Sequence, residues 1–193
     1  MQDEHPLPSG PDLSLVNLII LGVLIVGLSL LLRSVIKPPV SPQIGRPFPQ
    51  IEAVGWINGP APKAADLQGQ VIVVDAWAYW CGPCRAVTPY VIDLQKKYKD
   101  QGVIFIGLTS EGLDSGSIDS SRQFVKSLNI PWPNGYGATK TLSELEVEGI
   151  PQLWVVDRKN RIVYHEIGFG DNSIDEMDSA IKKALMESPS DKK

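Results

Sequence analysis

The feature that most constrains the fold is a buried-strand pattern that leads directly into the chain's only two cysteines. Residues 71–77, VIVVDAW, form an apolar and mostly β-branched run, which is typical of a strand covered on both faces. Cys81 and Cys84 follow within four to seven residues, and residues 84–100 then repeat apolar side chains at helical spacing. The pattern predicts a strand, a short turn that carries the cysteines, and a helix.

The middle of the chain continues with a second buried strand. Residues 103–109, VIFIGLT, follow Gly102, which is suited to end the preceding helix. The Gly/Ser/Asp-rich segment 110–121 predicts a loop that leads into a short helix from about Ser120 to Leu128.

The last third of the chain predicts a hairpin and a final helix. Residues 151–157 and 161–167 are two strand patterns separated by the turn RKN. Ser173 and Glu176 form a capping-box pattern before an amphipathic helix that continues to Leu185. This order of elements predicts an α/β fold in which helices flank a central mixed sheet.

An uncharged apolar run lies near the N-terminus, after a polar tail at residues 1–12. Twenty helical residues from Leu13 to Leu32 would extend about 30 Å, the thickness of a bilayer core. A cleaved signal peptide fits less well, because no basic segment precedes the run and no A-x-A-like site follows it. The sequence predicts a retained transmembrane anchor over residues 13–36.

The remaining boundaries follow from composition. Residues 37–43 are rich in proline and predict a stiff linker. The predicted domain covers residues 44–187, and residues 188–193 are predicted to form a flexible tail.

Composition excludes several classes of protein. The formal net charge is −4, with 21% charged and 43% hydrophobic residues. The sequence has no basic stripe of the kind that binds a phosphate backbone, so we expect no nucleic-acid partner. Two cysteines are too few for a disulfide-stapled scaffold or a four-cysteine metal site. His5 and His165 have no zinc-ligand spacing to the cysteines, so we expect no metal and no soluble cofactor.

The position of the cysteines favours redox chemistry over a structural disulfide. Cys81 should lie at the start of a helix, where free backbone N–H groups favour a thiolate, and Pro83 suits the first turn. The sequence predicts Cys81 as the more exposed nucleophile and Cys84 as the resolving thiol. A structural bridge across so short a loop would remove little chain entropy.

Asp75 is an acid inside a strand pattern that is otherwise apolar. A buried carboxylate has a raised pKa, so Asp75 could exchange a proton with Cys84. Alternatively, it faces solvent or caps a neighbouring amide. Pro151 precedes a predicted strand, and the sequence leaves open whether its peptide bond is cis.

The stretch VVDAWAYWCGPCR resembles the active-site segment of thioredoxins. The resemblance extends from about Ile44 to Leu185, and the segment before the cysteines resembles the membrane-anchored TlpA-like proteins of the redoxin branch. It implies a thioredoxin-like fold with Cys81 as nucleophile, Cys84 as resolving cysteine and Asp75 as proton-exchanging acid. It also implies that Pro151 is a cis-proline packed against the disulfide and that Pro89 kinks the active-site helix.

The same resemblance implies a surface that receives the substrate, with Trp80 as part of an apolar platform. The residues expected to bind substrate are Trp80, Gly82, Pro83, Ile150, Pro151 and Gly168. Two positions depart from the family pattern. Gln152 replaces the usual threonine, which could alter partner contacts, and Asp75 stands where many anchored relatives carry asparagine.

These features predict a membrane-tethered thiol-disulfide oxidoreductase that exchanges disulfides with protein cysteines. The resemblance suggests a reductase of apocytochrome c cysteines, recharged by a membrane or soluble electron donor, with residues 13–36 in the lipid bilayer. The alternatives are a thiol peroxidase of the redoxin type and a non-catalytic, membrane-tethered binding or metallochaperone module.

The sequence gives conflicting signals about the side of the membrane. Arg33 and Lys37 directly follow the apolar run, and the positive-inside rule would then place the domain in the cytoplasm. The family resemblance implies an extracytoplasmic domain, in the periplasm or on the cell surface. We expect an extracytoplasmic domain, and the cytoplasmic alternative stays open.

Overall fold

The computed structural model describes residues 13–35, 41–112 and 114–187. It divides the chain into two compact units, Met1–Val40 and Ser41–Lys193. The predicted tails at residues 1–12 and 188–193 lie outside the described residues. Residues 37–40 of the predicted linker also lie outside the described residues. Gln43, at the end of the linker, is buried in the second unit.

The described residues of the first unit form the helix α1 (Leu13–Val35), within the predicted anchor. In the described part of the chain, no helix meets the combined length and apolarity that crossing a membrane requires. The predicted membrane span is therefore not confirmed.

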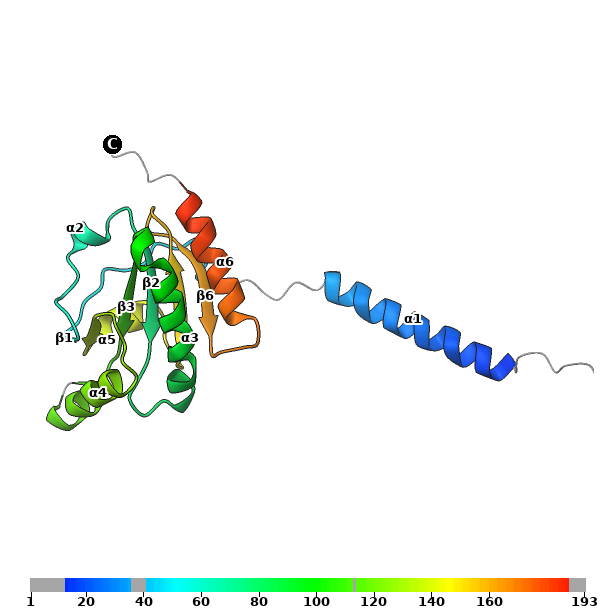
Figure 1. The fold of residues 1–193 in the computed structure, drawn as a ribbon, viewed down its shortest axis with the longest axis horizontal. Helices are drawn as coiled ribbons and strands as arrows, with labels where there is room; N and C mark the ends of the chain where they lie inside the picture. The colour runs from blue at the N-terminus through cyan, green and yellow to red at the C-terminus, as the bar shows by residue number, and fades with distance from the viewer. Residues whose placement is uncertain (1–12, 36–40, 113, 188–193) are drawn as a thin grey trace, which may run out of the picture. The chain divides into compact units, whose positions relative to one another are not determined.

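The second unit is built on a six-stranded mixed sheet with the order β1-β4-β3-β2-β5-β6 (Figure 1). β2 pairs in parallel with β3, and β3 pairs in parallel with β4, whereas the other three pairings are antiparallel. The predicted α/β fold with a central mixed sheet is confirmed. The strands are β1 (Gly55–Ile57), β2 (Val71–Ala76), β3 (Val103–Leu108), β4 (Asn134–Tyr136), β5 (Gln152–Val156) and β6 (Ile162–Ile167).

Two apolar clusters cover the two faces of this sheet. Because side chains alternate along a strand, Val71 and Val73 of β2 enter one cluster, and Ile72 and Val74 enter the other. The first cluster also contains both cysteines, so we call its side of the sheet the dithiol face. All six residues of β2 are buried, as the apolar run predicts.

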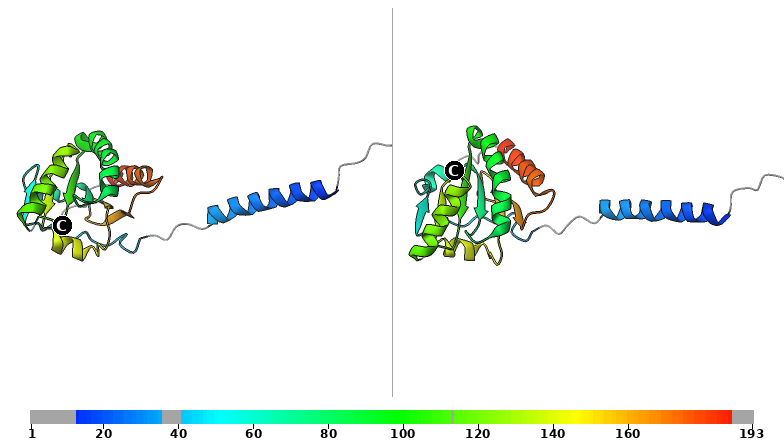
Figure 2. Two further views of the ribbon diagram at one scale, coloured as in Figure 1. Left: turned by 90° about the horizontal axis from the view of Figure 1, so that it is seen from below. Right: turned by 60° about the horizontal axis from the view of Figure 1, so that its bottom comes forward.

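The longer helices cover the dithiol face, and short elements cover the opposite face (Figure 2). α3 and α6 lie next to one another over the strands in Figure 1. The dithiol face carries α3 (Gly82–Tyr98), α4 (Ser115–Ser127) and α6 (Ser173–Met186). The opposite face carries α2 (Ala64–Leu67), α5 (Thr139–Glu144) and the segment before β1.

α3 is the predicted helix after the cysteines. Val87, Val91, Leu94 and Tyr98 are all buried on its inner side, which explains its helical spacing of apolar residues. The helix continues as a short 3-10 turn, Lys99–Gln101, and ends at Gly102, whose φ of 78° is left-handed.

The start of α4 was predicted wrongly. The helix begins at Ser115 rather than near Ser120. Asp114 is its N-cap residue, because the Asp114 side chain accepts a hydrogen bond from the Ser117 N–H at 2.9 Å. The Gly/Ser/Asp composition that suggested a loop thus includes the capping residue of the helix.

The predicted capping box of α6 is also wrong. The N-cap residue is Asn172, which makes no side-chain capping bond. The Ser173 hydroxyl instead accepts from the Gly170 N–H at 2.7 Å and donates to Glu166 at 3.0 Å. Ser173 therefore fixes the turn between β6 and α6 instead of capping the helix.

Candidate active site

The two cysteines lie at the carboxyl end of β2, where the chain turns into α3. They are joined in a disulfide with a Cα–Cα distance of 5.3 Å. Cys81 is 4% exposed and Cys84 is 1% exposed. The predicted order of exposure holds, but in the disulfide state both cysteines are almost covered.

The start of α3 is arranged to hold negative charge on Cys81. Cys81 is the N-cap residue of the helix, and its Sγ accepts a hydrogen bond from the Cys84 N–H at 3.1 Å. Pro83 lies in the first turn, as predicted. In the dithiol state, the same N–H and the helix N-terminus would stabilise a thiolate on Cys81 more than a neutral thiol.

Asp75 lies inside the sheet and on the dithiol face, because it alternates with Val74 and follows Val73 by two positions. It is 2% exposed, which excludes the alternative that it faces solvent. Its Oδ1 finds no hydrogen-bond partner among the described residues. Burial raises the pKa of this carboxyl from 3.8 to about 7, so Asp75 can take up or release a proton near neutral pH.

The surface beside the disulfide is formed by exposed residues of the turn. Trp80 is 63% exposed, and its indole Nε1 donates to Glu111 at 2.9 Å. Gly82 and Pro83 are also exposed. Sequence reasoning missed Glu111, because its position beside Trp80 depends on the parallel pairing of β2 and β3.

Pro151 and Gly168 lie at the same end of the sheet as the cysteines. The Ile150–Pro151 peptide bond is cis. The register pairs Ala76 with Gln152, so the loops after β2 and before β5 emerge together. The Gly168 N–H donates to the Pro151 carbonyl at 2.8 Å, which joins the end of β6 to this loop.

Ile150 and Gly168 contribute differently to this end of the sheet. Ile150 is half-buried and packs against the cluster that contains both cysteines. Gly168 has a φ of 82°, and a Cβ placed there would meet no atom within 4 Å. The structure thus brings all the predicted site residues to one end of the sheet.

Gln152, which departs from the family pattern, has its side chain inside the protein. It is buried, and its alternation with Leu153 turns its side chain to the face opposite the dithiol. Its Nε2 donates to the Gly149 carbonyl at 2.9 Å, and its Oε1 lies 2.8 Å from His165 Nε2. Burial lowers the pKa of His165, which is therefore neutral at pH 7.

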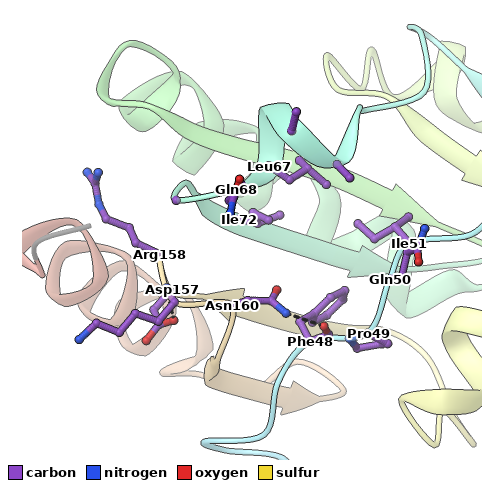
Figure 3. Close-up of a pocket in the computed structure, with 14 residues that line it drawn as sticks. Phe48, Pro49, Gln50, Ile51, Leu67, Gln68, Ile72, Asp157, Arg158 and Asn160 are labelled. Atoms are coloured by element: carbon purple, nitrogen blue, oxygen red, sulfur yellow. Dashed lines mark hydrogen bonds between the residues drawn. The ribbon is translucent and has the colours of Figure 1, made fainter. Parts of the chain in front are cut away.

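A hollow of about 750 Å³ lies at the other end of the sheet, on the face opposite the dithiol. Figure 3 shows it between Phe48 and Ile51, which precede β1, and the turn that joins β5 to β6. Ile72 near the start of β2 lies in its lining, whereas the cysteines follow the end of that strand. This hollow is therefore separate from the disulfide.

Metal ligation finds no support among the residues that the structure describes. No group of three or more His, Cys, Asp or Glu side chains in these ranges is placed to hold a metal ion.

Comparison with known sequences assigns most of the chain to one family. Residues 43–185 match the Redoxin family. The thiol-disulfide oxidoreductase ResA of Bacillus cereus is 28% identical over 127 residues, which cover 65% of this chain and 70% of ResA. Protein DipZ of Mycobacterium tuberculosis is 28% identical over 130 residues, 63% of this chain but only 18% of DipZ.

Comparison with solved structures confirms the thioredoxin-like fold. A crystal structure described as thiol:disulfide interchange protein DsbE from Chlorobium tepidum has a TM-score of 0.63 and 25% identity. It covers 74% of this chain and 97% of its own. A thiol-disulfide isomerase from Corynebacterium glutamicum has a TM-score of 0.64 at 22% identity and the same coverage, which supports the fold alone.

Proposed function

Because this chain belongs to the Redoxin family and is a thiol-disulfide oxidoreductase, we propose that Cys81 is its nucleophile toward disulfides of protein substrates. The observation that supports this most is the hydrogen bond from the Cys84 N–H to Cys81 Sγ at the start of α3. A thiolate at this position is stabilised, and Cys81 directly follows the exposed Trp80 in the turn.

In the proposed reaction the dithiol form is the reductant. The Cys81 thiolate attacks one sulfur of a substrate disulfide, a mixed disulfide forms, and the other substrate sulfur leaves as a thiolate. Cys84 then gives its proton to Asp75 and attacks Cys81 Sγ. The second substrate sulfur leaves as a thiolate, so two electrons pass to the substrate and the Cys81–Cys84 disulfide remains.

The cycle needs an electron donor that reduces this disulfide again. We propose a membrane or soluble dithiol protein for this step, and the two sulfurs need no soluble cofactor. Run in reverse, the same steps would oxidise substrate dithiols, and the direction depends on the reduction potential of the pair relative to its compartment.

The substrate is proposed to lie along the surface formed by Trp80, Gly82 and Pro83 on one side and by Ile150, Pro151 and Gly168 on the other. Exposure of the first three supports this, as does the open space beside Gly168. Among protein substrates we propose the cysteine pairs of apocytochrome c before haem attachment. Faster reduction of an oxidised C-x-x-C-H peptide than of a scrambled cysteine peptide would support this choice.

Attachment to a membrane is proposed from the sequence of residues 13–36. The large apolar side chains described in α1 are exposed along the helix, for example Leu18 at 67% and Val23 at 66%, and such side chains favour an apolar surrounding. We propose an extracytoplasmic domain. Alkaline extraction of membranes, compared with a variant that lacks residues 1–36, tests attachment, and an impermeant thiol reagent on intact cells tests the side.

The proposed roles of the two cysteines are tested by serine variants with a disulfide substrate. Cys81→Ser should abolish turnover, whereas Cys84→Ser should accumulate a mixed disulfide between Cys81 and the substrate, seen by mass spectrometry. The reverse pattern, in which Cys81→Ser traps the substrate, would contradict the assignment.

A further inference from the structure

One row of the sheet places polar side chains inside the apolar cluster of the dithiol face. The register pairs Asp75 with Leu153 on one side and with Gly107 on the other, and Gly107 pairs with Asn134. Residues directly opposite in neighbouring strands point to the same face. Asp75 and Asn134 therefore face the same side of the sheet, with a glycine between them.

Three atoms near this row have no hydrogen-bond partner among the described residues. They are Asp75 Oδ1, Asn134 Oδ1 and Trp77 Nε1. Their residues are 2%, 0% and 2% exposed, so bulk water does not satisfy them. Such atoms are rare in folded proteins, because leaving a buried polar group unpaired is costly.

Gly107, which pairs with Asp75 in the register, allows two of these atoms, Asn134 Oδ1 and Trp77 Nε1, to approach one another. A Cβ on Gly107 would overlap Asn134 Oδ1 and would lie 2.8 Å from Trp77 Nε1. The side-chain oxygen of Asn134 thus lies over Gly107, toward β2. Its orientation is fixed, because Asn134 Nδ2 donates to the Trp132 carbonyl at 2.7 Å.

The chemistry of the three atoms identifies what can join them. Two are acceptors when Asp75 is ionised, and the third, the indole N–H, is a donor. A single water molecule can donate to both acceptors and accept from the donor. Buried waters typically make about three hydrogen bonds of this kind.

We propose that Asp75, Asn134 and Trp77 form a binding site for one internal water molecule above Gly107. Asn134 and Trp77 are then positioning residues for Asp75. The water donates a hydrogen bond to the ionised carboxylate, so Asp75 can lose its proton near neutral pH and accept one from Cys84. This step rests on the role of Asp75 in the proposed function, but the water site itself does not.

Few other groups on this face can influence the protonation of Asp75. The titratable side chains buried in the same apolar cluster are Cys81, Cys84, Tyr98 and Tyr164, and Tyr79 and Tyr136 pack against it. Burial raises the pKa of Tyr98 and Tyr164, which therefore stay neutral at pH 7. A cation contacts the stacked rings on this face. The Arg85 guanidinium lies 4.9 Å from the Phe124 ring, which stacks on Trp77.

The site is tested on the oxidised full-length protein, which needs no turnover. NMR should show a nuclear Overhauser effect between a long-lived water and the Trp77 indole N–H in the wild type. The effect should be lost in Asn134→Leu and kept in Trp132→Phe. Trp132 is the matched control, because its indole N–H is also buried without a partner but packs on Phe105 of β3, two residues from Gly107.

The pKa of Asp75, followed by its carboxyl ¹³C shift, gives a second and independent result. Asn134→Leu should raise this pKa by about one unit or more, because the carboxylate loses a donor and its surroundings become drier. In catalysis the acid limb of the pH–rate profile should move upward by the same amount.

Two outcomes would overturn the proposal. One is the absence of a water contact at the Trp77 indole in the wild type, a result that needs no variant to fold. The other is a fall in the Asp75 pKa in Asn134→Leu, which would indicate a direct contact between the acid and the amide. If Cys81→Ser trapped the substrate while the water contact at Trp77 stayed intact, the proposed cysteine roles would fail and the water site would stand, so the two failures are distinguishable.

Discussion

Each end of the sheet contains a buried aspartate, and the two carboxylates differ in their hydrogen bonding. Asp157 at the turn between β5 and β6 is 1% exposed and accepts four hydrogen bonds. They come from the Lys159 N–H, the Arg161 N–H and two guanidinium N–H groups of Arg161, at 2.7–2.9 Å. Asp75 is 2% exposed, and its Oδ1 has no such bond within the described ranges.

This difference separates a carboxylate that stabilises the fold, Asp157, from one that can exchange a proton, Asp75. All the donors to Asp157 lie within four residues of it, so a local turn supplies all of its hydrogen bonds. Asp75 lies in a central strand between β3 and β5, where backbone groups are used by the ladders. Only a buried acid without fixed donors can change its protonation at little structural cost.

The largest expected effect comes from removing the satisfied carboxylate. Asp157→Ala should lower the free energy of unfolding by about 4 kcal/mol, because two backbone N–H groups and the Arg161 guanidinium lose their buried acceptor. Urea denaturation measures this. Asp93→Ala, which removes only an exposed pair with Lys96, is the control and should change stability by less than about 0.5 kcal/mol. Equal effects of the two variants would remove the distinction between the ends.

Asp75→Asn should raise the free energy of unfolding instead of lowering it, and the size of this effect should depend on pH. The folded-state pKa of Asp75 is about 7 against 3.8 in the unfolded chain, so the folded protein binds more protons between these values. The stability of the wild type should therefore fall as the pH rises from 4 through 7. The variant lacks this loss and should be more stable by about 4 kcal/mol at pH 8, and about equal at pH 4.

Urea titrations of both proteins at pH 4, 6 and 8 measure this difference. A constant difference across the three pH values would show that Asp75 does not titrate on folding.

The same substitution should slow the reaction. Asp75→Asn cannot accept the Cys84 proton, so single-turnover reduction of a protein disulfide at pH 7 should slow by tenfold or more. Tryptophan fluorescence in a stopped-flow instrument follows the step. Asp157→Asn, compared per folded molecule, should react at the wild-type rate. If both variants slow equally, the effect is structural.

The smallest effect is expected at the exposed ion pair next to Asp157. Glu187→Gln removes the negative charge that lies 3.3 Å from Arg161, whose side chain is 46% exposed. Stability should change by less than about 0.5 kcal/mol in urea denaturation. A loss near that of Asp157→Ala would mean that Arg161 depends on Glu187 for its orientation.

The sequence predicted the centre of the domain well, because its signals there are local. The apolar run of β2, the turn with both cysteines and the spacing of Val87, Val91 and Leu94 each fix a short segment without knowledge of the rest. The unusual position of Asp75 inside that run was visible for the same reason.

What the sequence did not predict depends on pairing between distant segments. β1 and β4 have three residues each and were missed, because they become strands only by pairing with distant segments, β1 with β4 and β4 also with β3. Asn134 and Glu111 approach the site through strand register, which no local pattern reveals. The start of α4 was missed because aspartate and serine are typical both of loops and of helix caps.

The segment that leads into the domain also closes the sheet at β6, its outer strand. The Gly45 N–H donates to the Ile162 carbonyl at 2.8 Å, and the Ile162 N–H donates to the Arg46 carbonyl at 2.9 Å. Pro47 forms a bridge with Arg161. Open strand edges pair readily with other chains and lead to aggregation. A shortened chain that begins after Phe48 would expose this edge, so solubility depends on residues that lie far from the disulfide.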